Sequence, residues 1–139
     1  MLKRTMGSLA AAVLVLSSVA WAQTESAGKD PVADGRKLSQ WVADLKAPAP
    51  QTRNAAAYEI SGLGPAAVSA VPALIEALDD PDPTVRFPVT VALAEIGPKA
   101  AAAVPKLKKM VDDEINDEIA AAARRALRRI APQALSDDQ

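Results

Sequence analysis

Apolar residues recur at helical spacing through most of the chain, and two adjacent stretches show the pattern most clearly. The stretch from Ala70 to Leu78 and the stretch from Pro83 to Ile96 each place their apolar residues on one helical face. Their apolar positions are Val71, Leu74, Ile75 and Leu78, then Val85, Val89, Ala92, Leu93 and Ile96. The pattern predicts two helices, each with one apolar stripe, joined by a short polar turn.

The residues at the ends of these stretches are typical of helix boundaries. Asp82 is predicted to cap the second helix, Pro83 to be its first residue and Gly97 to end it. Ser69 is predicted to cap the first helix. Pro72 then falls in its first turn, where a backbone N–H is not needed.

This two-helix unit is repeated along the chain. Gly64-Pro65 recurs as Gly97-Pro98, 33 residues later, and a third unit aligns when one inserted residue is allowed. Self-similarity at a fixed period indicates stacked repeats, and helices with one apolar stripe must stack to bury it. We therefore predict an all-α fold, a right-handed α-solenoid of about three antiparallel helix pairs.

The repeated motif resembles a known family. The segment VPALIEALDDPDPTVR, followed by VALAEIG, is similar to HEAT repeats, particularly the short units of phycobilin lyases that are common in bacterial proteins. The resemblance covers about residues 34–131. Ankyrin repeats need a Thr-Pro-Leu-His start and this chain has no His, while the tetratricopeptide pattern does not follow Trp41. The resemblance implies scaffold or adaptor work without fixing the ligand.

The start of the chain has the pattern of an export signal. Residues 1–22 are predicted to be a signal peptide, with Lys3 and Arg4 at the basic end and an apolar middle from Leu9 to Ala20. Ala20-Trp21-Ala22 is the expected cleavage site. We expect an exported protein, periplasmic or secreted, with no membrane span after cleavage; an uncleaved anchor is the alternative.

The remaining boundaries follow from composition and from the repeat. Residues 23–33 are predicted to be a flexible linker, Asp34 to cap a helix from Gly35 to Lys46, and residues 132–139 to form a polar tail that frays. The three repeats are expected at 34–64, 65–97 and 98–131.

Composition argues against an enzyme and against nucleic-acid binding. The chain has no His and no Cys, which removes the usual general base, the thiol nucleophile and the soft-metal ligands. Its 16 basic and 17 acidic residues leave a net charge of −1, so no basic footprint for nucleic acid is present. The acidic turns lack the alternating spacing and glycine of a calcium loop. We predict no catalysis, no cofactor and no metal.

Arginines and acidic turns are offset by one repeat. The first repeat has Arg53 but no turn acid, whereas the third has turn acids but Ala120 in place of the arginine. This offset predicts a ladder in which each arginine bonds the acidic turn of the next repeat. The expected pairs are Arg53 with Asp79 or Asp82, and Arg86 with Asp112, Asp113 or Asp117.

The second helices of the units are expected to line the concave face, where a partner would bind. Counting from the core positions places eight residues on that face: Asn54, Tyr58, Ser61, Phe87, Val91, Ala94, Arg125 and Arg128. Phe87 could instead tuck under a neighbouring helix, because Pro88 is expected to kink its own helix. The arginines of the last helix either cap the array or contact an anionic partner.

The sequence therefore predicts a non-catalytic scaffold that binds a protein or peptide. Two alternatives stay open at this stage. The chain could be an accessory subunit of an exported enzyme, or a chromophore-lyase-like helper. It could also be a structural component of the cell envelope.

Overall fold

The computed structural model describes residues 29–136. The chain divides into a unit from Met1 to Asp30 and a unit from Pro31 to Gln139, and all helices and strands described below belong to the second unit. The predicted signal peptide lies outside the described residues, as do residues 23–28 of the predicted linker.

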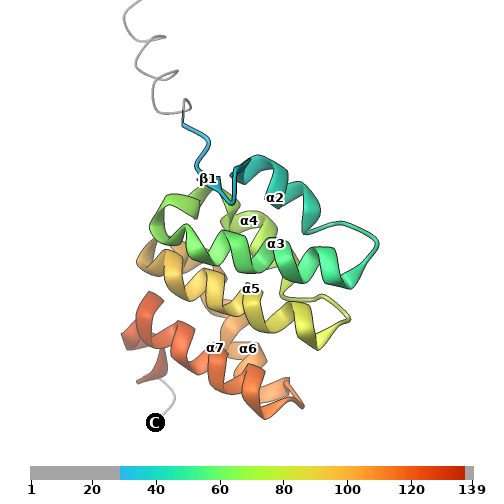
Figure 1. Ribbon diagram of the computed structural model, residues 1–139. Coiled ribbons are helices and arrows are strands. Elements are labelled where there is room, and N and C mark those ends of the chain that lie inside the picture. Colours follow the sequence, from blue (N-terminus) through green and yellow to red (C-terminus); the bar gives the residue numbers. More distant parts are fainter. Residues whose placement is uncertain (1–28, 137–139) are drawn as a thin grey trace, which may run out of the picture. The chain divides into compact units, whose positions relative to one another are not determined.

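The second unit contains three helix pairs in sequence order. They are α2 (Leu38–Asp44) with α3 (Pro50–Gly62), α4 (Val71–Ala77) with α5 (Pro83–Ile96), and α6 (Val104–Asp113) with α7 (Asp117–Ile130). The second helices α3, α5 and α7 pack side by side in one layer, and α4 and α6 lie behind them (Figure 1). The all-α architecture of three stacked helix pairs is confirmed.

Both ends of α5 have the residues that were predicted to begin and end it. The Asp82 side chain accepts a hydrogen bond from the Thr84 backbone N–H at 2.9 Å, and Pro83 is the first helical residue. Gly97 ends the helix with φ of 77°, a left-handed conformation that glycine adopts at little cost.

Short 3-10 segments between the repeats were not predicted. Segment η1 (Gly64–Ala70) leads directly into α4, and η2 (Gly97–Ala103) leads into α6. The predicted Ser69 cap is therefore wrong, because Ala70 holds the cap position of α4 and no side chain caps it. The Gly-Pro pair at the start of each segment turns the chain, and the tighter helix then carries it into the next repeat.

The first repeat begins with a small hairpin rather than a capped helix. Strands β1 (Val32–Ala33) and β2 (Arg36–Lys37) pair in an antiparallel register around Asp34 and Gly35. Both turn residues have positive φ, 47° and 73°, which is the geometry that Asp-Gly favours in two-residue hairpin turns. The assignment of Asp34 as a helix cap is wrong for this reason, and residues 32–33 of the predicted linker form a strand.

The hairpin is attached to α2 through Trp41. The indole Nε1 donates to the Ala33 carbonyl oxygen at 3.0 Å, and the Arg36 guanidinium lies 3.9 Å from the centre of the indole ring. Arg36 also pairs with Asp44 at 2.8 Å. These contacts lie on the side of the first repeat that no other repeat within residues 29–136 covers.

Small side chains dominate the contacts between neighbouring second helices. Ala56 and Ala57 of α3, Ala92 of α5, and Ala123 and Ala126 of α7 are fully buried. Alanine lets helix axes approach closely and costs no side-chain entropy on burial. The larger Ile60, Leu93 and Leu127 recur at the same place in each repeat and are also fully buried.

The end of the last repeat is more ordered than predicted. Residues Pro132–Leu135 form η3, which packs on α7, and Ala134 and Leu135 lie against the core. This part of the predicted polar tail therefore covers the last repeat. Residues 137–139 lie outside the described part of the chain.

One stretch of the described residues is long and apolar enough to cross a membrane. It runs from Pro83 to Asp113, but Gly97 divides it and 56% of its most apolar window is buried in the structure. Core helices of soluble proteins pass the same test, so the stretch is weak evidence for a membrane span.

Candidate functional site

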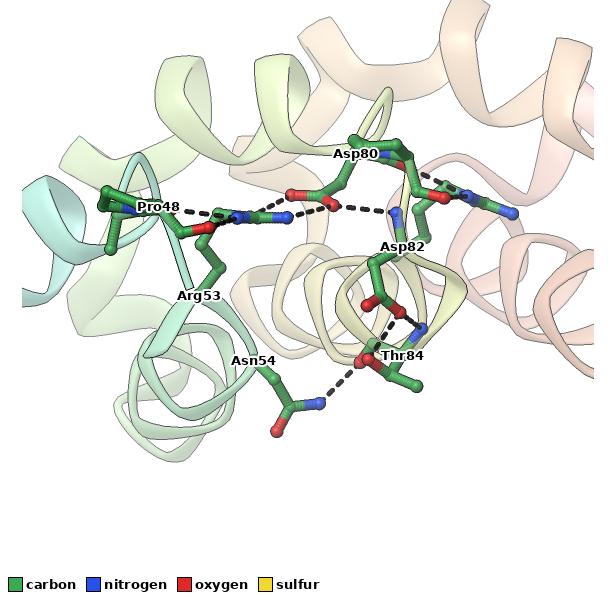
Figure 2. A network of polar contacts seen from close by, with 9 residues as sticks. Pro48, Arg53, Asn54, Asp80, Asp82 and Thr84 are labelled. Carbon is green, nitrogen blue, oxygen red and sulfur yellow. Dashed lines mark hydrogen bonds and ion pairs between the residues drawn. The ribbon is translucent and has the colours of Figure 1, made fainter. Parts of the chain in front are cut away.

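Arg53 joins the first repeat to the second. Its Nε and second terminal nitrogen donate to the two carboxylate oxygens of Asp80 at 2.6 and 2.9 Å, and its other terminal nitrogen donates to the carbonyls of Ala47 and Pro48 at 2.9 and 3.0 Å (Figure 2). The Asp80 side chain is only 6% exposed. One guanidinium therefore holds its own interhelical turn and the turn of the next repeat together.

Arg86 repeats this arrangement one unit later. It donates to both carboxylate oxygens of Glu114 at 3.0 and 3.1 Å, and to the carbonyls of Asp80 and Pro81 at 2.8 and 3.3 Å. The pairing of each arginine with the acid of the next repeat is thus present at both junctions. We call these two arginines with Asp80 and Glu114 the arginine ladder.

The predicted acceptors of the ladder were wrong. Asp79 pairs with Lys106 instead, Asp82 caps α5, and Asp113 lies 3.7 Å from Lys109 on its own helix. Asp112 and Asp117 are exposed. A signal for the true acceptors existed, because Asp80 and Glu114 occupy the same position once the one-residue insertion is counted.

The arginine ladder lowers the pKa of both acids that belong to it. The hydrogen bonds from Arg53 hold the pKa of Asp80 below its ordinary value near 3.8, even though burial opposes the charged form. Arg86 lowers the pKa of Glu114 from 4.5 in the same way. Asp80, in turn, raises the pKa of Arg53. These shifts mark a structural ion pair, since each charge already has its partner.

A shallow groove lies over the second helices, near the start of α5 and α7. We call it the second-helix groove, and its volume is about 320 Å³. It is lined by Asn54, Tyr58, Pro83, Thr84, Phe87, Asn116, Glu118 and Ile119. Three residues predicted for the partner face, Asn54, Tyr58 and Phe87, are therefore brought together in one depression.

Asn54 has a structural partner in the groove. Its Nδ2 donates to the Thr84 carbonyl oxygen at 2.5 Å (Figure 2). Thr84 stands four residues before Pro88, which has no N–H to offer that carbonyl within the helix. Asn54 of α3 thus supplies, from the neighbouring repeat, the hydrogen bond that the proline removes from α5.

The other residues predicted for the partner face differ in exposure. Tyr58 is 52% exposed, Phe87 and Val91 are half-buried, and Arg125 and Arg128 are exposed. Ser61 is half-buried and donates to the Tyr58 carbonyl at 2.7 Å, outside the residues that line the groove.

The placement of Ala94 on the partner face is wrong. It is only 5% exposed and belongs to the core. Helix α5 packs against both α3 and α7, so it buries a wider arc than the terminal helices. Three residues beyond Val91, the helix has turned by about 60° from the solvent-facing stripe.

Sequence reasoning missed part of the groove. Thr84, Asn116 and Glu118 line it, and none of them was predicted to belong to the partner face. Asn116 is the cap of α7, where its side-chain oxygen accepts from the backbone N–H groups of Glu118 and Ile119 at 3.0 and 3.2 Å. Helix starts from two repeats meet here because the repeats stack in register.

Comparison with known proteins agrees with this architecture. A family model described as HEAT repeats matches residues 38–128, from the start of α2 almost to the end of α7. The chain belongs to the HEAT-repeat family. No curated protein was found to match the sequence.

Membership in the HEAT-repeat family sets the general kind of function. HEAT repeats commonly serve as protein-binding scaffolds, and the family is generally non-catalytic. Among the described residues, no group of three or more acidic, His or Cys side chains is placed to hold a metal ion.

Proposed function

We propose that this chain is a non-catalytic binding scaffold whose protein or peptide partner docks on the second-helix groove. The observation that carries the proposal is the position of the single Tyr and the single Phe of the sequence. The sequence has one Tyr and one Phe, and both line this groove, with Tyr58 52% exposed. Aromatic side chains are among the residues that most often carry interface energy.

The arginine ladder supports the proposal by making the face rigid. Arg53 and Arg86 fix the turns that precede α5 and α7, and these turns set where Thr84, Asn116 and Glu118 stand. A preformed surface loses less conformational entropy on binding than a mobile one does. We further propose, from the pattern of residues 1–22 alone, that the scaffold works outside the cytoplasm.

Site-specific photo-crosslinking in the native host tests the proposal. A photoreactive phenylalanine analogue placed at Tyr58 should capture a partner of one defined mass. The same analogue at Lys109, an exposed position on α6 whose side chain is 75% exposed, should not capture it. Capture from Lys109 but not from Tyr58 would place the binding face on the first helices and overturn the proposal.

The identity of the captured partner distinguishes a scaffold from the two alternatives, an accessory subunit of an enzyme and a structural component of the envelope. An enzyme whose activity falls when this gene is deleted would make the chain an accessory subunit. Capture of further copies of the chain, at high abundance, would indicate a structural role in the envelope.

A further inference from the structure

The charges on α7 are separated along one edge of the helix. Glu118 lies in its first turn and lines the second-helix groove beside Phe87 of α5. Arg125 follows seven residues later, which is nearly two full turns, so both side chains leave the helix on the same side. Arg129, one turn beyond Arg125, pairs with Glu95 of α5 at 2.7 Å and shows that this edge faces α5.

Asp117, Arg124 and Arg128 stand on the other edge of the same helix. Counting about 100° per residue, they lie on the side of the exposed face that points away from α5. All three are exposed. Helix α7 therefore carries the same order of charges, acidic then basic, on an edge beside the groove and on an edge away from it.

The groove offers two side-chain acceptors to an incoming donor, Asn54 and Glu118. Because Asn54 uses its Nδ2 to bond the Thr84 carbonyl, its Oδ1 points away from that bond (Figure 2). The Glu118 carboxylate is a second acceptor, and it is absent from the ion pairs of residues 29–136. The Tyr58 and Phe87 rings line the same groove, and aromatic faces attract cations.

We propose that the partner presents a Lys or Arg side chain to the second-helix groove and an acidic side chain to Arg125. The cation would lie beside Glu118 and against the Tyr58 ring. Arg125 is exposed and makes no ion pair among the described residues, and it would hold the acid. The two charges of the partner stand about 10 Å apart. Three residues of a polyproline II chain span about this distance, and that conformation returns to the same side at every third residue. This inference rests on the proposed function and names the chemistry of the partner.

Fluorescence anisotropy with labelled synthetic peptides tests the inference on the chain from Gln23 onward. The probe is an octapeptide of polyproline II type that carries Arg and, three residues later, Glu in an otherwise Pro/Ala/Ser sequence. Three comparison peptides differ from the probe only at the two charged positions. The first has Gln at both positions, the second has Arg at both and the third has Glu at both. At low salt the dipolar peptide should bind about 5-fold to 20-fold more tightly than the Gln peptide, and added salt should remove most of the difference.

Matched variants locate the effect on one edge of α7. Glu118→Lys and Arg125→Glu should each weaken binding of the dipolar peptide several-fold and remove most of its advantage over the Gln peptide. Asp117→Lys and Arg124→Glu make the same charge changes on the other edge and should have little effect. Equal losses from both edges, or tightest binding by the two-Glu peptide, would overturn the inference.

Two further outcomes separate this inference from the proposed function. If the dipolar and Gln peptides bind equally and Tyr58→Ala weakens both, the groove binds peptides but the charge pattern is wrong. If no peptide binds up to about 1 mM, the dipolar ligand is wrong, while the photo-crosslinking from Tyr58 still decides the proposed function.

Discussion

Asn54 and Pro88 belong to different repeats, yet they act on the same carbonyl group. Pro88 leaves the Thr84 carbonyl without its helical donor, and Asn54 donates to that oxygen at 2.5 Å. At the equivalent positions of the next junction the chain has Phe87 and Ala122, so neither partner is present there. Pro88 is therefore accommodated by a residue of the preceding repeat, and helix α5 continues through it to Ile96.

The pair predicts non-additive effects on stability. Asn54→Ala should lower the free energy of unfolding by about 0.5–1.5 kcal/mol, because it removes a hydrogen bond to a carbonyl with no other helical donor. In a Pro88→Ala background the loss should shrink toward zero, since the alanine that replaces the proline supplies its own backbone N–H to the Thr84 carbonyl. Urea denaturation of the four proteins measures the coupling. Gln51→Ala, an exposed change on the same helix, is the control, and strict additivity would contradict the pairing.

The arginine ladder should contribute more to folding stability than the ion pairs on the surface do. Asp80→Asn and Glu114→Gln should each lower the melting temperature by several degrees, because each leaves a largely buried guanidinium without its bidentate partner. Asp113→Asn removes an exposed pair, whose side chains are 75% and 63% exposed, and should change the melting temperature by about a degree or less. Equal changes in melting temperature for all three variants would show that the ladder stabilises the fold no more than an exposed ion pair does.

Acid should destabilise the protein in part through the same two carboxylates. Asp82, whose pKa is lowered by its hydrogen bonds from Thr84, contributes in the same direction. Because the folded state lowers the pKa of Asp80 and Glu114, their contribution is complete above the ordinary values of 3.8 and 4.5 and is lost as the pH falls below them. With no His in the chain, stability should be nearly constant between about pH 5 and 8. The test measures the melting temperature from about pH 8 down into acid for the original protein and for the Asp80→Asn, Glu114→Gln double variant. The difference between the two curves gives the contribution of the two carboxylates. The variant should show a flatter decline in acid, and an unchanged slope would contradict the assignment.

The two groove aromatics should respond differently to truncation. Tyr58 is 52% exposed, so Tyr58→Ala should weaken capture of the partner and leave the melting temperature within about 2 °C of the original. Phe87 is half-buried on α5, so Phe87→Ala should reduce both capture and the melting temperature. Calorimetry beside the capture assay separates the two effects. A large drop in melting temperature for Tyr58→Ala would assign it a structural role.

Export should remove the first 22 residues. Mass spectrometry of protein recovered from its host is then expected to find Gln23, or its cyclised form, at the amino terminus. Full-length protein in the membrane fraction would instead mean that Leu9–Ala22 is retained as an anchor.

The local and periodic features of this protein could be predicted from the sequence. The Gly-Pro pairs, the Asp82-Pro83 helix start and the 33-residue spacing depend on chain geometry within one or two helices. The ladder could also be predicted as a pattern, because an arginine and an acid absent at opposite ends of an array imply pairing between neighbours. The Asp34-Gly35 turn was misinterpreted even though its signal is local, since Asp is common both at helix starts and in hairpins.

Only the tertiary structure decided which side chains meet. The acidic turn holds several carboxylates within a few residues, and the direction of each one depends on how α4, α5 and α6 pack; Asp80 therefore reaches Arg53 while Asp79 reaches Lys106. The burial of Ala94 and the meeting of Asn54 with Thr84 depend likewise on the spacing between second helices. A repeat pattern determines that helices stack, because apolar stripes must be buried. It does not determine the rotation of each helix about its axis, and small changes in that rotation select the contacts of the groove.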